Sequence, residues 1–391
     1  MKLNDLPDAF VSDLVAIRRD IHANPELGYL ETRTSALVAE RLRSYGVDEV
    51  HTGIAKTGLV GVIRGKRSGG SIGLRADMDA LPMQEKNTFF HASKVAKVMH
   101  ACGHDGHTTI LLGAARYLAE TRNFAGTVHL IFQPAEEGGA GGEMMVKEGL
   151  FDRFDCDRIF AFHNRPDLAL GKWGARAGPF MAAADGFTIE VRGSGGHAAR
   201  PHLTCDPMTV AANIVLAAQT IVSRNVSPME TAVVGISAIE GGNLPAFAVV
   251  PDTVKMTGTV RTFDAATRDL IEARLGELVS GICDAHRAKG VLKYNRLYPS
   301  VVNTAPEVEF ARQTAAEIWG DENVDGDYMR SMGGEDFSFM LQKRPGCYSV
   351  IGQGLPSGIV PLHNTGYDFC DEIIPNGVRY FSRLVERGLP L

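Results

Sequence analysis

Cysteine and histidine side chains crowd into one short stretch, Met99–His107, which constrains this chain more than any other feature of its sequence. The stretch reads MHACGHDGH, so three histidines and one cysteine fall within residues 100–107. The following residues, Thr108–Leu118, predict a helix, for which Asp105 is a candidate N-cap. Thiolate and imidazole ligands suit Zn, Mn, Co or Ni better than Mg or Ca, which prefer oxygen. The stretch therefore predicts a metal site at a helix N-terminus, although alone it also fits buried histidines beside an inert thiol.

Three expected strands end in side chains that can bind a metal. They are Ser71–Arg75, followed by Asp77 and Asp79; Thr127–Phe132, followed by Glu136 and Glu137; and Arg158–Phe162, followed by His163. A further strand, Cys347–Ile351, precedes a loop that contains His363. Sites in open α/β sheets form outside the carboxyl ends of strands, where loops converge. We therefore expect these side chains to meet at one edge of a sheet, although His163 or His363 alone also fits a structural, hydrogen-bonded histidine.

The pattern of the chain changes near residue 185, and a length of 391 residues favours two domains. The segments after this point predict the order β-α-β-β-α-β, which is the ferredoxin-like split unit. They are Gly186–Val191, Asp206–Arg224, Thr231–Ile239, Thr253–Phe263, Ala265–Lys289 and Val291–Leu297. We therefore expect an α/β protein with a discontinuous metal-binding domain of mixed sheet, residues 1–184 and 298–391, and an inserted ferredoxin-like domain, residues 185–297.

A glycine-rich basic turn, Arg192–His202, follows the first strand of the expected inserted domain. It contains His197 and Arg200 among several glycines. Such a turn fits a flexible surface loop. It also fits a set of hydrogen-bond donors that meets a developing oxyanion or a substrate carboxylate.

Charge and cysteine usage limit the partners and the compartment. A net charge of −6 gives no electrostatic case for binding nucleic acid or an anionic membrane. The first residues lack a secretory hydrophobic segment, and no apolar run approaches membrane-spanning length. Six cysteines are scattered without framework spacing, which predicts a reducing cytoplasm and no disulfides.

Eight segments spread over nearly the whole chain carry a family resemblance. In chain order they are Arg18–Gly28 (RRDIHANPELG), Leu74–Pro82 (LRADMDALP), Met99–Thr108 (MHACGHDGHT), Phe132–Gly139 (FQPAEEGG), Gly193–His202 (GSGGHAARPH), Gly258–Phe263 (GTVRTF), Met332–Phe337 (MGGEDF) and Leu362–Asn364 (LHN). These motifs resemble those of the dinuclear metallo-amidohydrolases related to aminoacylases and glutamate carboxypeptidases, in the branch of hippurate hydrolases, N-acyl-amino-acid amidohydrolases and plant auxin-conjugate hydrolases. The resemblance implies a metallopeptidase-like catalytic domain with an inserted lid and dimerisation domain.

The resemblance also implies roles for individual residues. Five match the ligands of two divalent metal ions, here Mn, Zn, Co or Ni, and they are Cys102, His104, Glu137, His163 and His363. Glu136 matches the general acid/base, which takes a proton from metal-activated water and passes it to the leaving amine. His197 matches a histidine that stabilises the tetrahedral oxyanion and often comes from the partner subunit of a dimer. Asp79 and Asp77 match carboxylates that orient the ligands.

Assembly and substrate contacts follow from the same resemblance. A homodimer or a dimer-based tetramer is expected, with the inserted domain at the interface. The candidates for substrate binding are Arg200, Arg261 and Asn243. Glu335 and Asp336 match a segment near the site without a defined role. Ala248 departs from the family, which usually has asparagine there in the substrate region, so the substrate preference does not follow from the resemblance.

We expect a cytoplasmic enzyme that cleaves the amide bond between an acyl group and an amino acid. A dipeptidase or carboxypeptidase with the same dinuclear centre is the nearest alternative. A cysteine amidase, with Cys102 as nucleophile and His104 or His107 as the orienting group, is more distant. It leaves Glu136 and Glu137 without a role. A non-enzymatic metal-binding module would likewise have no use for Glu136 beside the ligands.

Overall fold

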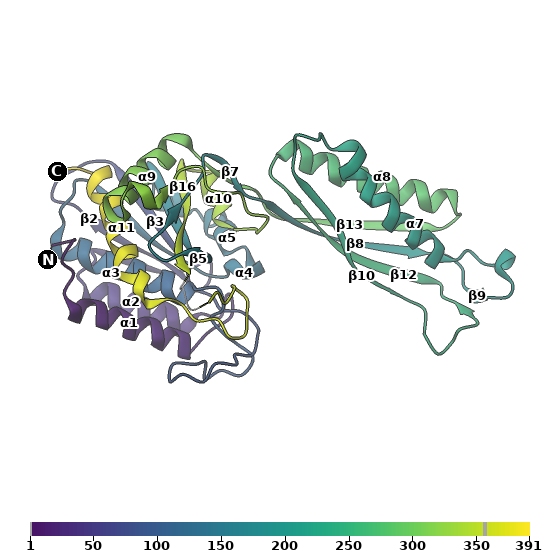
Figure 1. The fold of residues 1–391 in the computed structure, drawn as a ribbon, viewed down its shortest axis with the longest axis horizontal. Helices are drawn as coiled ribbons and strands as arrows, with labels where there is room; N and C mark the ends of the chain where they lie inside the picture. The colour runs from purple at the N-terminus through teal and green to yellow at the C-terminus, as the bar shows by residue number, and fades with distance from the viewer. Residues whose placement is uncertain (1, 355–357) are drawn as a thin grey trace. The chain divides into compact units, whose positions relative to one another are not determined.

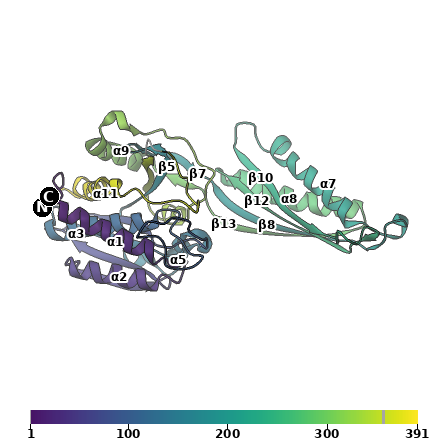
Figure 2. The same ribbon diagram turned by 60° about the horizontal axis from the view of Figure 1, so that its bottom comes forward.

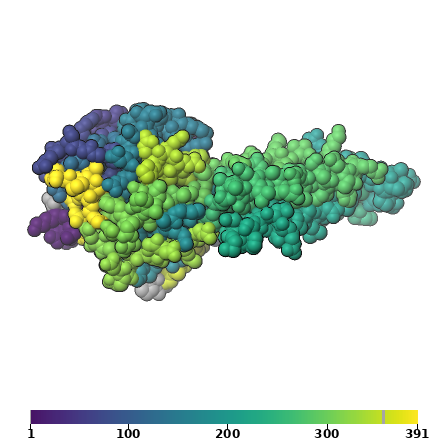
Figure 3. Space-filling model, turned by 90° about the horizontal axis from the view of Figure 1, so that it is seen from above, coloured from purple at the N-terminus to yellow at the C-terminus, as the bar shows by residue number. Residues whose placement is uncertain are grey.

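The chain divides into two compact units, and the computed structural model describes residues 2–354 and 358–391. The first unit comprises Met1–Gly178, Val302–Met329 and Asp336–Leu391, and the second comprises Pro179–Val301 and Arg330–Glu335. The second unit carries the teal and green of the middle of the chain (Figure 3), because it interrupts the first in sequence. The segment Arg330–Glu335 lies outside the range 185–297 expected for the inserted domain.

An eight-stranded mixed sheet forms the centre of the first unit, in the order β1-β2-β4-β3-β5-β16-β6-β15 (Figure 1). Its strands are β1 (Glu49–Ile54), β2 (Gly58–Arg64), β3 (Ser71–Asp77), β4 (Thr127–Gln133), β5 (Arg158–Ala169), β6 (Trp173–Gly174), β15 (Val324–Asp325) and β16 (Gly346–Gly354). Strands β4, β3, β5 and β16 are parallel neighbours. Their carboxyl ends therefore point to one edge of the sheet, as the sequence predicts.

Long helices pack against this sheet and against one another. They are α1 (Asp8–Ala23), α2 (Thr32–Ser44), α3 (His104–Thr121), α9 (Ala305–Trp319) and α11 (Ile374–Gly388). Figures 1 and 2 show α1, α3 and α11 side by side. Gly113 of α3 permits this close packing, because a Cβ atom there would lie 2.5 Å from Val378 and 2.7 Å from Leu14.

A four-stranded antiparallel sheet and two helices form the second unit, with the strand order β10-β12-β8-β13. In chain order the elements are β8 (Ala183–Arg192), α7 (Pro207–Thr220), β10 (Ala232–Gly241), β12 (Thr253–Thr262), α8 (Ala265–Ala285) and β13 (Lys289–Tyr298). This is the predicted order β-α-β-β-α-β. Asp206 and Asp264 cap the two helices, because their carboxylates accept hydrogen bonds from backbone N–H groups of the first turn.

Short elements complete the chain. They are α4 (Glu136–Gly139), α5 (Gly141–Lys147), α6 (Leu150–Arg153), β7 (Gly178–Met181), β9 (Gly196–His197), η1 (Pro201–Leu203), η2 (Ile221–Asn225), β11 (Val249–Val250), β14 (Val301–Asn303), η3 (Asp321–Asn323), α10 (Phe337–Leu341) and η4 (Asp371–Ile373). No helix within the described ranges combines the length and the apolar character needed to cross a membrane.

Strand β5 is longer than the sequence predicts. It continues past Phe162 to Ala169, because it stays paired with β16 in parallel register, with His163 opposite Val350. His163 therefore lies within a strand and not in the loop after it. Strand β1 and the C-terminal helix α11 have no counterpart among the expected elements.

Candidate metal centre

Helix α3 begins inside the cysteine–histidine stretch, at His104, and not after it. Its N-cap is Gly103, which has a φ of 97° and is packed so closely that a Cβ atom would lie 2.3 Å from Asn164 Oδ1. Only glycine fits there. The expectation that Asp105 caps the helix is wrong. Its buried carboxylate instead accepts a hydrogen bond from His22 Nδ1 at 2.9 Å and lies 3.6 Å from an Arg18 nitrogen, because buried basic groups compete for it.

One buried carboxylate, that of Asp79, aligns three groups of the centre. Its Oδ1 lies 3.2 Å from His104 Nδ1, and its two oxygens accept hydrogen bonds from the backbone N–H groups of Glu136 and Glu137 at 3.0 and 2.9 Å. When His104 donates from Nδ1, its Nε2 carries the lone pair that a metal ion requires. That Nε2 is buried and has no hydrogen-bond partner among the described residues.

The loop that bears Glu136 and Glu137 is held in an uncommon backbone conformation. Ala135, just before the pair, has a φ of 51°, and its N–H donates to Glu31 Oε1 at 2.8 Å. A non-glycine residue at positive φ costs about 1–2 kcal/mol and persists where its surroundings impose it. Here the buried Glu31 and Asp79 fix the loop, so adjacent glutamates can point to different partners.

Cys102 and His163 lie in contact, with Cys102 Sγ 3.3 Å from His163 Nε2. His163 Nδ1 lies 2.8 Å from the backbone carbonyl oxygen of Asn164 and donates to it, which leaves the Nε2 lone pair directed at the sulfur. Burial, together with the nearby His107, lowers the pKa of His163 well below its usual value. His163 is thus a neutral imidazole with an available lone pair.

A turn near the C-terminus brings His363 to the same place. Its backbone N–H donates to the carbonyl oxygen of Ala101 at 2.8 Å, which ties the turn to the cysteine–histidine stretch. His363 has a φ of 59°, and its Nε2 lies 3.1 Å from Glu137 Oε1. The five residues that the sequence singled out as ligands therefore lie together in the first unit.

Three overlapping groups of closely spaced donor atoms consist only of the five predicted ligands and Glu136. The atoms of each group lie within 4.8 Å of one another, and the groups are Cys102, His104 and His163; Cys102, Glu137 and His363; and His104, Glu136 and Glu137. Sulfur, nitrogen and oxygen donors in this combination fit Zn, Mn, Co or Ni. The buried Nε2 of His104, which has no hydrogen-bond partner among the described residues, fits the same conclusion, since buried polar atoms are otherwise hydrogen-bonded.

Carboxylates dominate the electrostatics of this centre. Burial opposes the charged form of His104, but Asp77 and Asp79 raise its pKa to about 10. Burial raises the pKa of the Cys102 thiol well above its usual range, and Glu137 raises it further. The carboxylates around His104 and Cys102 thus favour a cation at this place. A free cysteine nucleophile requires a lowered pKa, so the thiol is not activated by its protein surroundings.

His107 is not among the predicted ligands but contacts residues of the centre. Its Nδ1 lies 2.6 Å from Asp77 Oδ1, its Nε2 lies 2.8 Å from Asn164 Oδ1, and its ring packs against that of His163 at 4.6 Å between centroids. Because both nitrogens are engaged, His107 holds its neighbours in place. Sequence reasoning missed Asn164, although its position directly after His163 was a signal that could have found it.

The remaining candidates, except Asp336, lie in the second unit. Backbone N–H of Ala199 donates to His197 Nδ1 at 3.1 Å, so the exposed imidazole of His197 presents an N–H at Nε2. Arg200 and Asn243 are exposed, and Arg261 of β12 donates to Thr259 Oγ1 and to a backbone carbonyl oxygen. Ala248 and Glu335 lie in the second unit, and Asp336 lies in the first.

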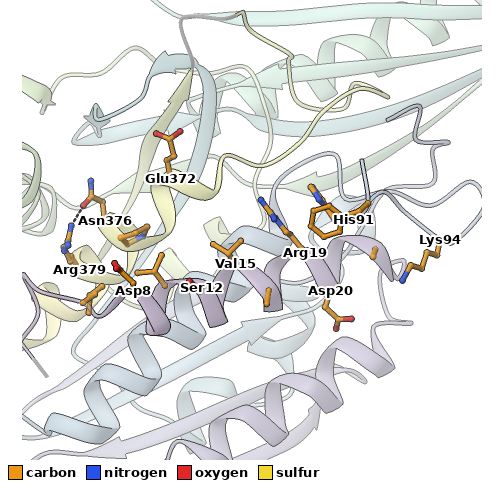
Figure 4. Close-up of a pocket in the computed structure, with 16 residues that line it drawn as sticks. Asp8, Ser12, Val15, Arg19, Asp20, His91, Lys94, Glu372, Asn376 and Arg379 are labelled. Carbon is orange, nitrogen blue, oxygen red and sulfur yellow. Dashed lines mark hydrogen bonds between the residues drawn. The ribbon is translucent and has the colours of Figure 1, made fainter. Parts of the chain in front are cut away.

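A groove of about 1070 Å³ runs along the outer side of α1 (Figure 4). Apolar side chains such as Val11 and Val15 line it together with Arg19, Lys94 and Glu372. None of the residues that line it belongs to the predicted site. The chemistry singled out by the sequence therefore lies elsewhere, at the carboxyl edge of the sheet.

The donor atoms at this sheet edge define a centre for divalent metal ions on an α/β scaffold. The chain belongs to peptidase family M20/M25/M40, whose family model matches residues 73–387.

Similar proteins span almost the whole chain. A hippurate hydrolase of Campylobacter jejuni is 41% identical over 373 residues, which cover 95% of this chain and 96% of that protein. An N-acetylcysteine deacetylase of Bacillus subtilis is 36% identical over 377 residues, covering 96% and 97%. A dinuclear metal-binding peptidase of the M20 family from Bacillus subtilis has a solved structure with 32% identity and a TM-score of 0.84, covering 98% of this chain and 99% of that one.

Proposed function

We propose that this protein is a metal-dependent amidohydrolase that hydrolyses the amide bond of an N-acyl amino acid. The observation that carries the proposal is the convergence of five donor side chains and the adjacent Glu136 at one edge of the sheet. The names of the relatives, a hippurate hydrolase and an N-acetylcysteine deacetylase, support this substrate class.

The five ligand candidates would hold two divalent metal ions, of Mn, Zn, Co or Ni, and they are Cys102, His104, Glu137, His163 and His363. When bound, the metal ions supply Lewis acidity, which polarises the substrate carbonyl and lowers the pKa of water. Glu136 takes a proton from the attacking water on its carboxylate and delivers it to the leaving amine nitrogen. Asp79 supports this division, because it fixes the backbone N–H groups of both glutamates.

The second unit acts as a lid and as the dimerisation domain of a homodimer or a dimer-based tetramer. Strand β10 is an edge strand with exposed residues, and edge strands are ready to pair or pack with another chain. Arg200, Arg261 and Asn243 contact the substrate. A cytoplasmic location fits the six cysteines, all of which are free.

A substrate panel tests the proposed function against the dipeptidase alternative. The purified protein, loaded in turn with Mn, Zn, Co and Ni, is assayed on N-benzoyl, N-acetyl and indole-acetyl amino acids and on unblocked dipeptides. We expect kcat/KM to be at least roughly tenfold higher for an N-acyl amino acid, the scale of discrimination that pocket contacts provide. Faster hydrolysis of a dipeptide would favour the alternative, and no hydrolysis with any metal would overturn the proposal.

The substitution His197→Ala is expected to lower kcat by roughly a hundredfold, the effect of losing one oxyanion donor. The reason is that the N–H at Nε2 of His197 would bind the oxyanion in the transition state more strongly than the carbonyl in the ground state. Steady-state kinetics and elemental analysis check this, and metal content should be unchanged. His202→Ala, in the same exposed turn, is the matched control and should retain wild-type kcat.

Mixed dimers show whether His197 acts on its own subunit or on its neighbour. A Glu136→Gln protein is mixed with a His197→Ala protein under conditions of proven subunit exchange. If each site receives its histidine from the neighbour, a mixed dimer regains one active site of two. An absence of recovery would mean that His197 acts within its own chain or not at all.

A further inference from the structure

The carboxylate of Asp336 is fully buried, and it lies where the chain re-enters the first unit after the segment Arg330–Glu335. A buried carboxylate is costly unless charged and hydrogen-bonding partners surround it. Asp336 has such partners, and each of them belongs to, or adjoins, the machinery of the candidate metal centre.

Two of these partners flank the loop that carries Glu136 and Glu137. Gln133, the last residue of β4, donates from Nε2 to the Asp336 oxygens at 2.7 and 2.9 Å. The backbone N–H of Gly142 in α5 donates to Asp336 Oδ2 at 2.8 Å. A single carboxylate thereby joins the start and the end of the loop, residues 134–141.

Gly142 is shaped for this contact. A Cβ atom at this position would lie 2.8 Å from the Asp336 backbone oxygen and 3.1 Å from its carboxylate carbon. Any other residue would push the loop away from Asp336. The glycine therefore allows the close approach that the hydrogen bond from its N–H requires.

Arg75 extends the arrangement to the metal ligands. The guanidinium is 1% exposed and donates to Asp336 Oδ1 at 3.1 Å, to Gln133 Oε1 at 2.9 Å and to Asp77 Oδ2 at 2.6 Å. Asp77 in turn contacts His107, whose ring packs against His163. The network thus connects the glutamate loop to the opposite side of the centre.

We propose that Asp336 is a positioning residue, which fixes the glutamate loop so that Glu137 reaches the metal ions and Glu136 reaches the attacking water. The role given to Glu136 in this inference rests on the proposed function. The expected effect of Asp336 on metal binding does not depend on that function. Asp336 acts through its hydrogen bonds with Gln133, Gly142 and Arg75. This gives a role to a residue for which the family resemblance offered none.

The substitution Asp336→Asn tests the proposal, because it keeps the shape but replaces an acceptor oxygen by a donor that faces other donors. We expect the variant to bind Co²⁺ about 10–100-fold more weakly, the usual effect of losing a partner that orients a ligand. The visible absorption spectrum of the cobalt-loaded protein should change. We expect kcat for an N-acyl amino acid to fall by a similar factor while KM stays close to wild type.

Glu386→Gln is the matched control. Glu386 is a carboxylate of intermediate burial paired with an arginine, and it accepts a hydrogen bond from Tyr117 OH, which lies 13 residues beyond His104 on α3. That separation is about 20 Å along a helix. This variant can lose stability but should keep the cobalt spectrum, the Co²⁺ affinity and kcat of the wild type.

Gly142→Ala provides a second test from the other side of the contact, and it decides the matter if Asp336→Asn does not fold. It should reproduce the weaker Co²⁺ binding, the altered spectrum and the lower kcat. A folded variant with an unchanged spectrum and unchanged Co²⁺ affinity would overturn the inference. The cobalt measurements need no turnover, so they remain decisive even if the wild-type protein hydrolyses no N-acyl amino acid.

Discussion

Prolonged chelation is expected to abolish turnover of N-acyl amino acids, and added Mn, Co or Zn to restore it. The five donor side chains belong to overlapping groups of closely spaced donor atoms, and the buried Nε2 of His104 has no hydrogen-bond partner among the described residues. Without bound metal ions, nothing polarises the substrate carbonyl or lowers the pKa of the attacking water. Activity assays on aliquots whose metal content is followed by elemental analysis would measure this.

The control for chelation is the same chelator saturated with the metal under test, which should leave activity intact. The contact between Cys102 and His163 makes the experiment decisive, because a thiol beside an imidazole is also the geometry of a cysteine nucleophile. A cysteine amidase would keep its activity without metal. Full activity in a protein shown to be metal-free would therefore reject the metal-dependent mechanism.

The position of the site could be predicted from the sequence because it depends on strand direction. Asp77, Asp79 and the glutamate pair follow strands that run parallel, and parallel strands deliver their carboxyl ends to one edge. His163 also lies at this edge, although the sequence predicts it in a loop after the strand. It lies inside β5, where pairing with β16 outlasts the apolar run that the sequence displays.

Hydrogen-bond partners far apart in sequence were beyond prediction. His104 and His107 are three residues apart and share one face of α3, so spacing alone gives them equal claims as ligands. Asp77 and Asn164 engage both nitrogens of His107, whereas Nε2 of His104 has no hydrogen-bond partner among the described residues. For the same reason Asp105 was mistaken for a helix cap. Its buried partners come from α1, more than eighty residues away.

Helix α11 is absent from the elements expected from the sequence, for a reason unrelated to distant contacts. Pro375 and Gly377 near its start resemble a turn, but proline is well tolerated in the first turn of a helix. Val378, Phe381 and Val385 are buried at helical spacing and pack in the core of the first unit. The periodic signal was therefore present in the sequence, although this helix is absent from the expected elements.

The substitution Glu136→Gln is expected to lower kcat by about two to four orders of magnitude, the range for a positioned general acid/base, while the protein keeps its metal. The amide has the same shape as the carboxylate but cannot take a proton from water at neutral pH. The backbone N–H of Glu136 would still donate to Asp79, so the loop should keep its conformation. Single-turnover kinetics and elemental analysis would measure the two effects separately.

Glu137→Gln is the matched comparison, because it makes the same chemical change one residue further along the same loop. Glu137 lies against His363 and within the donor groups that contain Cys102 and His104, so this variant should lose metal affinity first. Excess metal should then recover part of its activity, whereas excess metal should not help Glu136→Gln, since its defect is in proton transfer. If Glu136→Gln lost its metal while Glu137→Gln kept it, the two assignments would have to be exchanged. Asp79 would then align the loop so that Glu136 binds the metal and Glu137 acts as the general acid/base.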